Sequence, residues 1–196
     1  MDMEQKKSGY QTREQDRRLP ALGLAVLLGA LGGSLLCARW PWLQTVLSDR
    51  GQASGVLWQA LWPDVVLLGL MLLSGFLRAG CLTALLAAGA KGFLLSAFAT
   101  LFVVNTGREG YVQALCTALL PGFFSLSALL LLGRQALGLA LVRLSLPPGK
   151  GRKAMPDSTY FFTFLMGLGL LLLAAVLSVR LSPKLWAAAQ TFLPNS

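Results

Sequence analysis

The stretch WPDVVLLGLMLLSGFLRAGCLTALLAAGAKGFLLSAFATLFVV, residues 62–104, decides the fold of this chain. Only three of its 43 residues are charged. Roughly 20 apolar residues in an α-helix suffice to cross a hydrocarbon core of about 30 Å, so this stretch is too long for one crossing. We therefore expect a hairpin of two membrane-spanning helices, near 63–77 and 80–104, with Gly75 and Gly80 at its turn.

The composition of the whole chain also indicates a membrane protein. Of its 196 residues, 55% are hydrophobic and 13% are charged. A soluble domain carries about 25% charged residues, and a water-facing surface cannot be built from half that number. A lipid-facing surface needs no charge. We expect an all-α, polytopic helical membrane protein with about five transmembrane helices.

Three further apolar stretches complete the expected set of spans. They lie near 20–38, 111–132 and 160–179, and with the hairpin they form a transmembrane domain over residues 20–180. Pro121 falls inside the fourth span, where it removes a backbone N–H and should kink the helix. After this span, RQALGLALVRLSL, residues 134–146, is expected to continue as an amphipathic segment that ends at Pro147 and Pro148.

The remaining segments are expected to lie outside the membrane. Residues 1–19 are polar and predict a flexible cytoplasmic tail, whereas residues 181–196 predict a short amphipathic tail on the outer side. The interval 39–61 is expected to be an outer loop, in which Leu43 to Leu61 would form a short amphipathic helix. Four of the five tryptophans cluster around this loop and indicate an interfacial belt: Trp40, Trp42, Trp58 and Trp62.

The basic residues predict the orientation of the chain in a cell membrane. With the N-terminus inside, 11 of the 17 Lys and Arg residues lie on the inner side, in the tail, at Arg78 and in the loop 133–157. Five lie outside, and Lys91 lies within a span. This asymmetry favours a multi-pass protein with the N-terminus inside and the C-terminus outside. The net charge of +9 is thereby explained without a nucleic-acid partner.

Charged and small residues within the spans are the candidate functional positions. Lys91 is costly in mid-membrane, by about 2.5–3.5 kcal/mol on insertion scales. Its ammonium group would either pair with Asp64 or with backbone carbonyls, or reach an interface along its flexible stem. Gly29 and Gly33 are spaced as in the G-x-x-x-G motif, which either marks close helix packing or reflects the abundance of glycine in membrane helices.

No catalytic or cofactor-binding motif is found in the sequence. The chain has no histidine, and its three cysteines form no Cys-x-x-Cys pair, so metal sites and histidine-dependent catalysis are not expected. No phosphate-binding loop is present, and we expect neither enzyme activity nor a cofactor. Cys37 and Cys116 are both placed toward the outer side, where a disulfide is conceivable, although buried thiols are the favoured alternative.

Residues 90–137, AKGFLLSAFATLFVVNTGREGYVQALCTALLPGFFSLSALLLLGRQAL, resemble the core of the stage II sporulation protein M family. Lys91, Gly92 and Phe93 match its Lys-Gly opening, and the other matching positions are a short glycine turn and a proline break: Gly107, Gly110 and Pro121. The first span, the outer loop and the last span fit the family in order and size.

The resemblance implies a membrane scaffold, without catalytic activity, of the bacterial engulfment machinery. Its implied partners are the peptidoglycan hydrolases of endospore formation, an amidase and a lytic transglycosylase. Candidate intramembrane positions are Asp64, Lys91, Gly92 and Pro121. The alternative function is a transport component, either a permease or the membrane subunit of an uptake system, with Lys91 and Pro121 lining a site at mid-membrane. Association of the chain with itself is left open.

Overall fold

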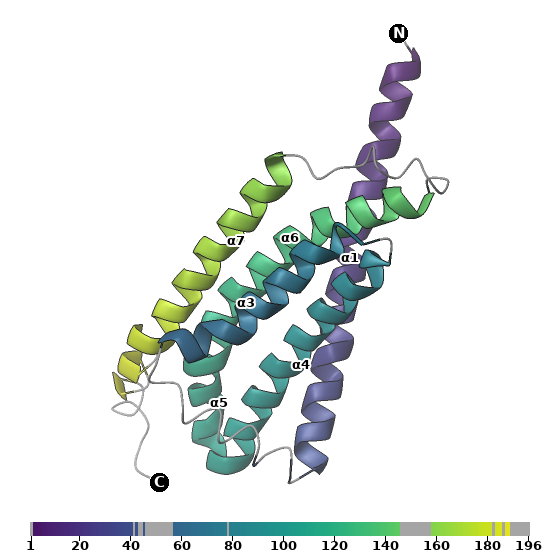
Figure 1. Ribbon diagram of the computed structural model, residues 1–196. Helices are drawn as coiled ribbons and strands as arrows, with labels where there is room; N and C mark the ends of the chain where they lie inside the picture. Colours follow the sequence, from purple (N-terminus) through teal and green to yellow (C-terminus); the bar gives the residue numbers. More distant parts are fainter. Residues whose placement is uncertain are drawn as a thin grey trace.

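The computed structural model describes residues 2–40, 42, 45, 57–77, 79–145, 158–181, 183–185 and 187–188. These residues form helices and turns, and no strand occurs among them, so the protein is an all-α polytopic helical protein. Figure 1 shows the principal helices running alternately up and down the molecule. The elements are α1 (Asp2–Arg39), α3 (Leu57–Ser74), α4 (Gly80–Thr106), α5 (Arg108–Ala114), η1 (Leu115–Leu119), α6 (Leu120–Ser145), α7 (Ser158–Val176) and η3 (Leu177–Leu181).

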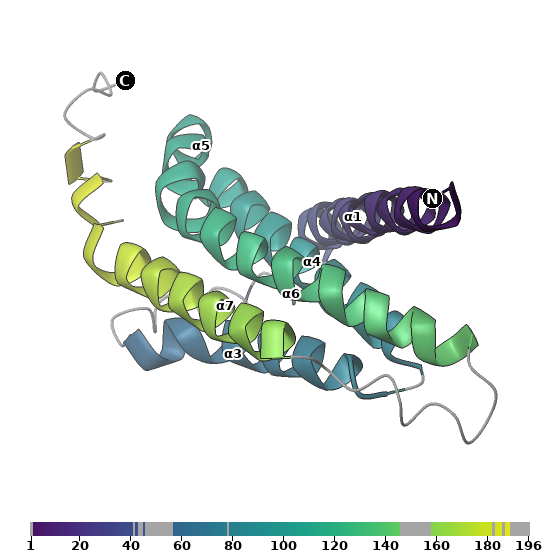
Figure 2. The same ribbon diagram turned by 90° about the horizontal axis from the view of Figure 1, so that it is seen from above.

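Helices α4 and α6 occupy the middle of the bundle. Helix α1 packs along α4 on one side, and α7 packs along α6 on the other. Helix α3 lies across α4, α6 and α7 and contacts all three (Figure 2). The start of α1 and the end of α7 lie at opposite ends of the molecule (Figure 1), which is the arrangement that an odd number of alternating helices produces.

Four helical stretches in the described part of the chain are long and apolar enough to cross a membrane. They cover Arg18–Arg39, Gly80–Thr106, Glu109–Leu144 and Ser158–Leu185. The second expected span, 63–77, corresponds to α3, Leu57–Ser74, an 18-residue helix whose apolar stretch includes Leu61–Ser74. Since an α-helix rises 1.5 Å per residue, α3 covers about 27 Å, close to the hydrocarbon thickness of about 30 Å.

The turn of the α3–α4 hairpin lies where the sequence predicts it. Helix α3 ends at Ser74 and α4 begins at Gly80. The N–H groups of Gly75 and Phe76 donate to carbonyls of the last turn of α3, at 3.3 and 2.9 Å. A Cβ at Gly80 would overlap the carbonyl oxygen of Ser74, so this position requires glycine. Arg78 lies outside the described residues.

The N-terminal segment differs from expectation. The sequence predicts a flexible tail over residues 1–19, but α1 starts at Asp2 and runs through Pro20 without ending. The expectation of a flexible tail is wrong because this segment is rich in Glu, Gln, Lys and Arg, all good helix formers. The long apolar helix that follows also removes the cost of nucleating a separate one.

The fourth span continues as a helix beyond residue 132, as the amphipathic stretch 134–146 predicts. After a turn at Gly107, which has a φ of 62°, helical structure continues from Arg108 to Ser145. The helix ends at Ser145, shortly before the two prolines where the continuation is expected to end, Pro147 and Pro148. Residues 146–157, the remainder of the expected basic loop, lie outside the described residues.

Pro121 is accommodated by a π-helical segment. Directly before it, residues 115–119 form η1, and the N–H of Leu120 donates to the carbonyl of Leu115, five residues back. A π-turn provides room where a proline ring would otherwise collide with a carbonyl one turn earlier. The second π-segment, η3, likewise ends two residues before a proline, Pro183. The sequence predicts a kink at Pro121. The structure has a local π-helical distortion before this residue, and the helix continues through it.

The outer loop and C-terminal tail are described only in part. Helix α3 starts at Leu57, so the expected loop is shorter than 39–61. Within it, the rings of Trp40 and Trp42 lie 5.9 Å apart. Of the expected amphipathic helix, Leu43 to Leu61, residues 43–56 lie outside the described residues except for Thr45, and residues 57–61 form the start of α3. Most of the expected tail beyond Leu185 lies outside them too.

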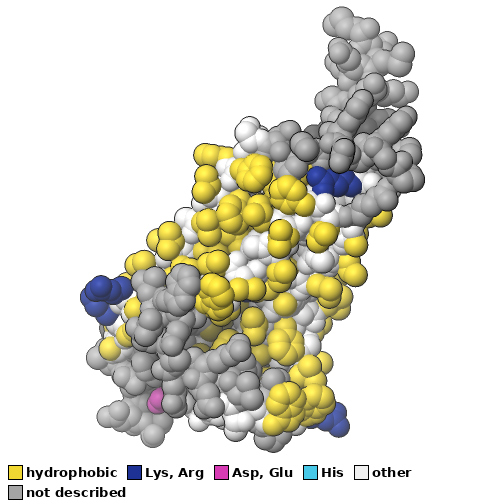
Figure 3. All heavy atoms as spheres, in the orientation of Figure 1, with side chains coloured by type: hydrophobic (Ala, Val, Ile, Leu, Met, Phe, Trp, Pro, Cys, Tyr) yellow, Lys and Arg dark blue, Asp and Glu magenta, His cyan; other side chains and the backbone are white. Residues whose placement is uncertain are grey.

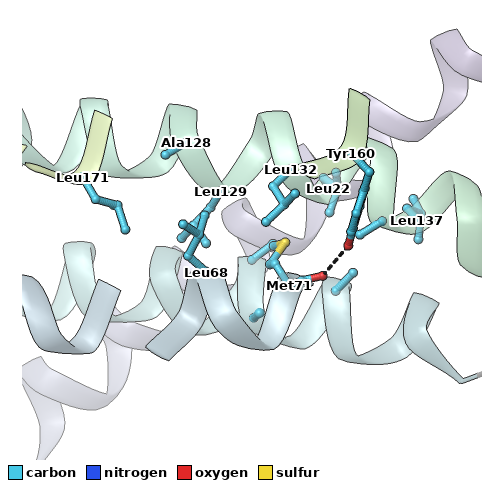
Figure 4. Packing of buried hydrophobic residues seen from close by; sticks show 13 residues of the cluster. Leu22, Leu68, Met71, Ala128, Leu129, Leu132, Leu137, Tyr160 and Leu171 are labelled. Atoms are coloured by element: carbon cyan, nitrogen blue, oxygen red, sulfur yellow. Dashed lines mark hydrogen bonds between the residues drawn. The ribbon is translucent and has the colours of Figure 1, made fainter. Parts of the chain in front are cut away.

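The interior is packed with leucine and alanine, and the exterior is apolar as well. The core side chains of α1, α3, α6 and α7 interdigitate in Figure 4, including Leu22, Leu68, Met71, Leu129, Leu132 and Leu171. On the surface shown in Figure 3, hydrophobic side chains predominate and Lys and Arg appear near helix ends. This pattern is the one expected of helices surrounded by lipid, because exposed apolar area of this extent is rare on soluble proteins.

Candidate functional site

An ion pair between α3 and α4 is the most polar feature of the described interior. The ammonium Nζ of Lys91 donates to Oδ1 of Asp64 at 2.5 Å. The two side chains are only 8% and 17% exposed. The sequence leaves three partners open for the ammonium group of Lys91: Asp64, backbone carbonyls or the membrane interface. In the structure it pairs with Asp64.

The pair offsets the cost of placing Lys91 within an apolar helix. A buried charge without a partner is costly, whereas a paired and hydrogen-bonded one is tolerated. The hydrogen bond between Nζ and Oδ1 is charge-assisted, and such bonds are stronger than those between neutral groups. The pair therefore connects α3 to the bundle in a way that apolar contacts alone would not.

Glycines bring α1 and α4 into backbone contact next to this pair. A Cβ at Gly29 would overlap the carbonyl oxygen of Gly89, and one at Gly33 would overlap that of Phe93. A Cβ at Gly92 would overlap the carbonyl oxygen of Val26. The G-x-x-x-G motif of α1 therefore lies at a helix–helix interface, which agrees with the interpretation that it allows close helix packing.

A hydrogen bond joins the same two helices. The hydroxyl of Ser96 donates to the carbonyl of Ala30 at 2.7 Å and lies 3.2 Å from the carbonyl of Phe93 in its own helix. Close approach of the backbones is what allows a short serine side chain to reach across. The sequence alone does not predict this bond, although serines on membrane helices that are rich in small residues often form such bonds between helices.

The four candidate positions do not form a single site. Asp64 and Lys91 are in contact, and Gly92 is adjacent to Lys91 but packs against α1. Pro121 is buried on α6, and the next residue, Gly122, packs against Leu95 of α4. Leu95 is one helical turn beyond Lys91. All four therefore lie on or beside α4.

Tyr160, which was not among the candidate positions, connects α7 to α3 through hydrogen bonds. The hydroxyl of Tyr160 donates to the carbonyls of Leu72 at 2.8 Å and Met71 at 3.2 Å (Figure 4 shows the bond to Met71). Carbonyls in the last turn of a helix lack the usual intrahelical N–H donor. Here Leu72 accepts from the N–H of Gly75 and Met71 from the hydroxyl of Ser74, and Tyr160 adds a donor from the first turn of α7. The ring of Tyr160 is 98% buried and meets Phe76 edge to face at 6.4 Å.

The cysteines and acidic residues form no reactive centre in the described helices. Cys37, Cys81 and Cys116 all lie in these helices and form no disulfide there. Cys37 packs in a small cluster with Ala97 and Leu101, as a small hydrophobe. Among the described residues, no three His, Cys, Asp or Glu side chains come together as metal ligands would.

No protein-family model, curated protein or solved structure matches this chain.

Proposed function

We propose that this protein is a non-catalytic scaffold of the cell membrane, with its N-terminus inside and its C-terminus outside. In this proposal it holds peptidoglycan-remodelling enzymes, an amidase and a lytic transglycosylase, during endospore engulfment. The resemblance of residues 90–137 to the stage II sporulation protein M family supplies the biological setting. Those residues make up most of α4, all of α5 and η1, and more than half of α6.

One observation favours a scaffold over a protein that binds a solute. Among the described residues, no buried side-chain nitrogen or oxygen lacks a hydrogen-bond partner. A site that binds a polar solute within the membrane would contain buried polar atoms without a hydrogen-bond partner in the protein, which the solute would then satisfy. Here the polar groups of the interior bind one another, as Lys91 and Asp64 do. This favours a rigid structural role over solute recognition.

The test is capture of partners from a sporulating bacterium. A tagged full-length protein is isolated in mild detergent at the stage of engulfment, and co-purifying proteins are identified. We expect both wall hydrolases, and we expect a deletion strain to arrest at engulfment. Normal engulfment in the deletion strain would contradict the proposal.

The second candidate function is a transport component, favoured by the position of the ion pair within the apolar hairpin. A pair that opens to admit a solute or a proton would serve transport. The Lys91→Met variant distinguishes the two functions when combined with Asp64→Asn, so that no buried charge is left alone. A scaffold should keep its partners with this double variant, whereas a transporter should lose uptake. A deletion strain that sporulates normally but loses uptake of a solute would favour transport.

A further inference from the structure

The ion pair between Lys91 and Asp64 uses only part of its hydrogen-bonding capacity. An ammonium group has three N–H donors, and a carboxylate accepts hydrogen bonds on both of its oxygens. Here one bond joins Nζ of Lys91 to Oδ1 of Asp64. In the described part of the chain, neither charged group forms a further hydrogen bond. Two N–H donors of Lys91 and the second oxygen of Asp64, Oδ2, can therefore bind another partner.

The buried hydroxyl groups differ from this pair, because each donates its single hydrogen within the protein. Ser74 donates to the carbonyl of Met71, and Ser125 donates to that of Gly122. The hydroxyl of Tyr160 donates to carbonyls at the end of α3. These groups have no donor left, whereas the ammonium group of Lys91 has two.

The second oxygen of Asp64 is accessible from outside the protein. Every fully enclosed side-chain nitrogen or oxygen among the described residues has a hydrogen-bond partner. Oδ2 has no such partner, so it is not fully enclosed, which agrees with the 17% exposure of the Asp64 side chain. A molecule in contact with Oδ2 also lies beside the ammonium group, because the other oxygen of the same carboxylate binds Nζ of Lys91.

The depth of the pair limits which molecule can bind there. Asp64 lies ten residues before the end of α3 and Lys91 eleven residues after the start of α4, so both are about 15 Å from the turn that joins these helices. In a hydrocarbon core of about 30 Å, this places the pair near the middle. Lipid chains offer neither donors nor acceptors at that depth.

We propose that the Lys91–Asp64 pair binds a water molecule at mid-membrane depth. The water accepts a hydrogen bond from Nζ of Lys91 and donates one to Oδ2 of Asp64. Water is suited to this position because it is small and is both donor and acceptor, and buried waters in proteins typically bind polar groups whose capacity is not exhausted. The inference goes beyond the scaffold role and is independent of it, since the water completes a structural pair.

The test is proton-detected solid-state NMR of the full-length protein in phosphatidylcholine bilayers, with ¹⁵N-labelled lysine. Magnetisation is transferred from water to the lysine ammonium groups. The signal of Lys91 is the one that is missing from the Asp64→Leu/Lys91→Met variant, which leaves no buried charge behind. We expect transfer from water to the Lys91 ammonium group. A Lys91 signal that receives no magnetisation from water would overturn the proposal.

The hydroxyl of Tyr160 is the internal control. Its hydrogen is already donated to the carbonyls of Met71 and Leu72 in the last turn of α3, so it lies nearer to the turn than the ion pair does. We expect no transfer from water to this hydroxyl at a mixing time that gives transfer to Lys91. Equal transfer to both groups would show that water penetrates the bundle generally, and it would overturn a specific site. Tyr160→Phe removes the hydroxyl and should leave the transfer to Lys91 unchanged.

Discussion

Asp64 and Lys91 lie almost equally far from the turn that joins their helices, and their side chains meet in a 2.5 Å ion pair. Asp64 is ten residues before the end of α3 at Ser74, and Lys91 is eleven residues after the start of α4 at Gly80. At 1.5 Å per residue, both are about 15 Å from the turn. The antiparallel hairpin therefore brings the two charges to the same depth.

Removal of either charge should destabilise the protein. Lys91→Met leaves the carboxylate of Asp64 without its counter-ion, and Asp64→Leu leaves the ammonium group of Lys91. Loss of one partner of a buried pair costs about 3–5 kcal/mol. The measurement is the free energy of unfolding by SDS titration in mixed micelles. The combined variant Asp64→Leu/Lys91→Met leaves no buried charge and should recover most of the loss. If the double variant loses as much free energy of unfolding as the two single variants together, loss of the ion pair is not the cause of the destabilisation.

Side chains at the contact between α1 and α4 should separate the two helices. Gly29→Ala places a Cβ against the carbonyl of Gly89, which belongs to the backbone and cannot move aside. Overpacking of this kind costs about 1–3 kcal/mol. The same unfolding measurement tests it. Gly23→Ala is the matched control, because nothing lies within 4 Å of a Cβ at Gly23 on the same helix. Equal effects at both positions would indicate a change in helix propensity and not in packing.

Loss of the Tyr160 hydroxyl should loosen the junction between α7 and α3. Tyr160→Phe keeps the ring but leaves the carbonyls of Met71 and Leu72 without this donor. Because the hydroxyl has one hydrogen, shared between these two carbonyls, we expect a total loss of about 0.5–1.5 kcal/mol in the free energy of unfolding. Tyr111→Phe is the control, since Tyr111 is 66% exposed. Hydrogen exchange of the amides that follow Ser74 should increase only in the first variant, and unchanged exchange would contradict the role of Tyr160.

The orientation of the chain can be measured with single cysteines. In a background without the three native cysteines, Glu109→Cys places a thiol at an exposed position in the first turn of α5. With the N-terminus inside, this thiol should react with a membrane-impermeant maleimide in intact cells. Ser8→Cys should react only after permeabilisation. The reverse pattern would show that the basic residues do not set the orientation in the predicted sense.

The helical, membrane-spanning character of the protein follows from the sequence because it depends on local properties. Length and apolar composition of a stretch suffice to predict a span, since lipid provides no hydrogen bonds and forces the backbone into helices. The hairpin in residues 62–104 is predicted in this way, and α4 begins at Gly80 as expected. The extent of α1 is not predicted, because polar residues beside a span continue a helix as readily as they form a loop.

The contacts within the bundle were decided only by the tertiary structure. The sequence places Lys91 in a span and proposes Asp64 as one of several partners, but the pairing depends on the rotation of α3 about its axis. Likewise, the G-x-x-x-G spacing at Gly29 is compatible with packing or with chance, and only the position of α4 distinguishes the two. Tyr160 has no local signal at all, since its partners are the carbonyls of a helix more than 80 residues earlier. Hydrophobicity determines which segments enter the membrane, whereas relative rotation and depth of the helices determine which residues meet.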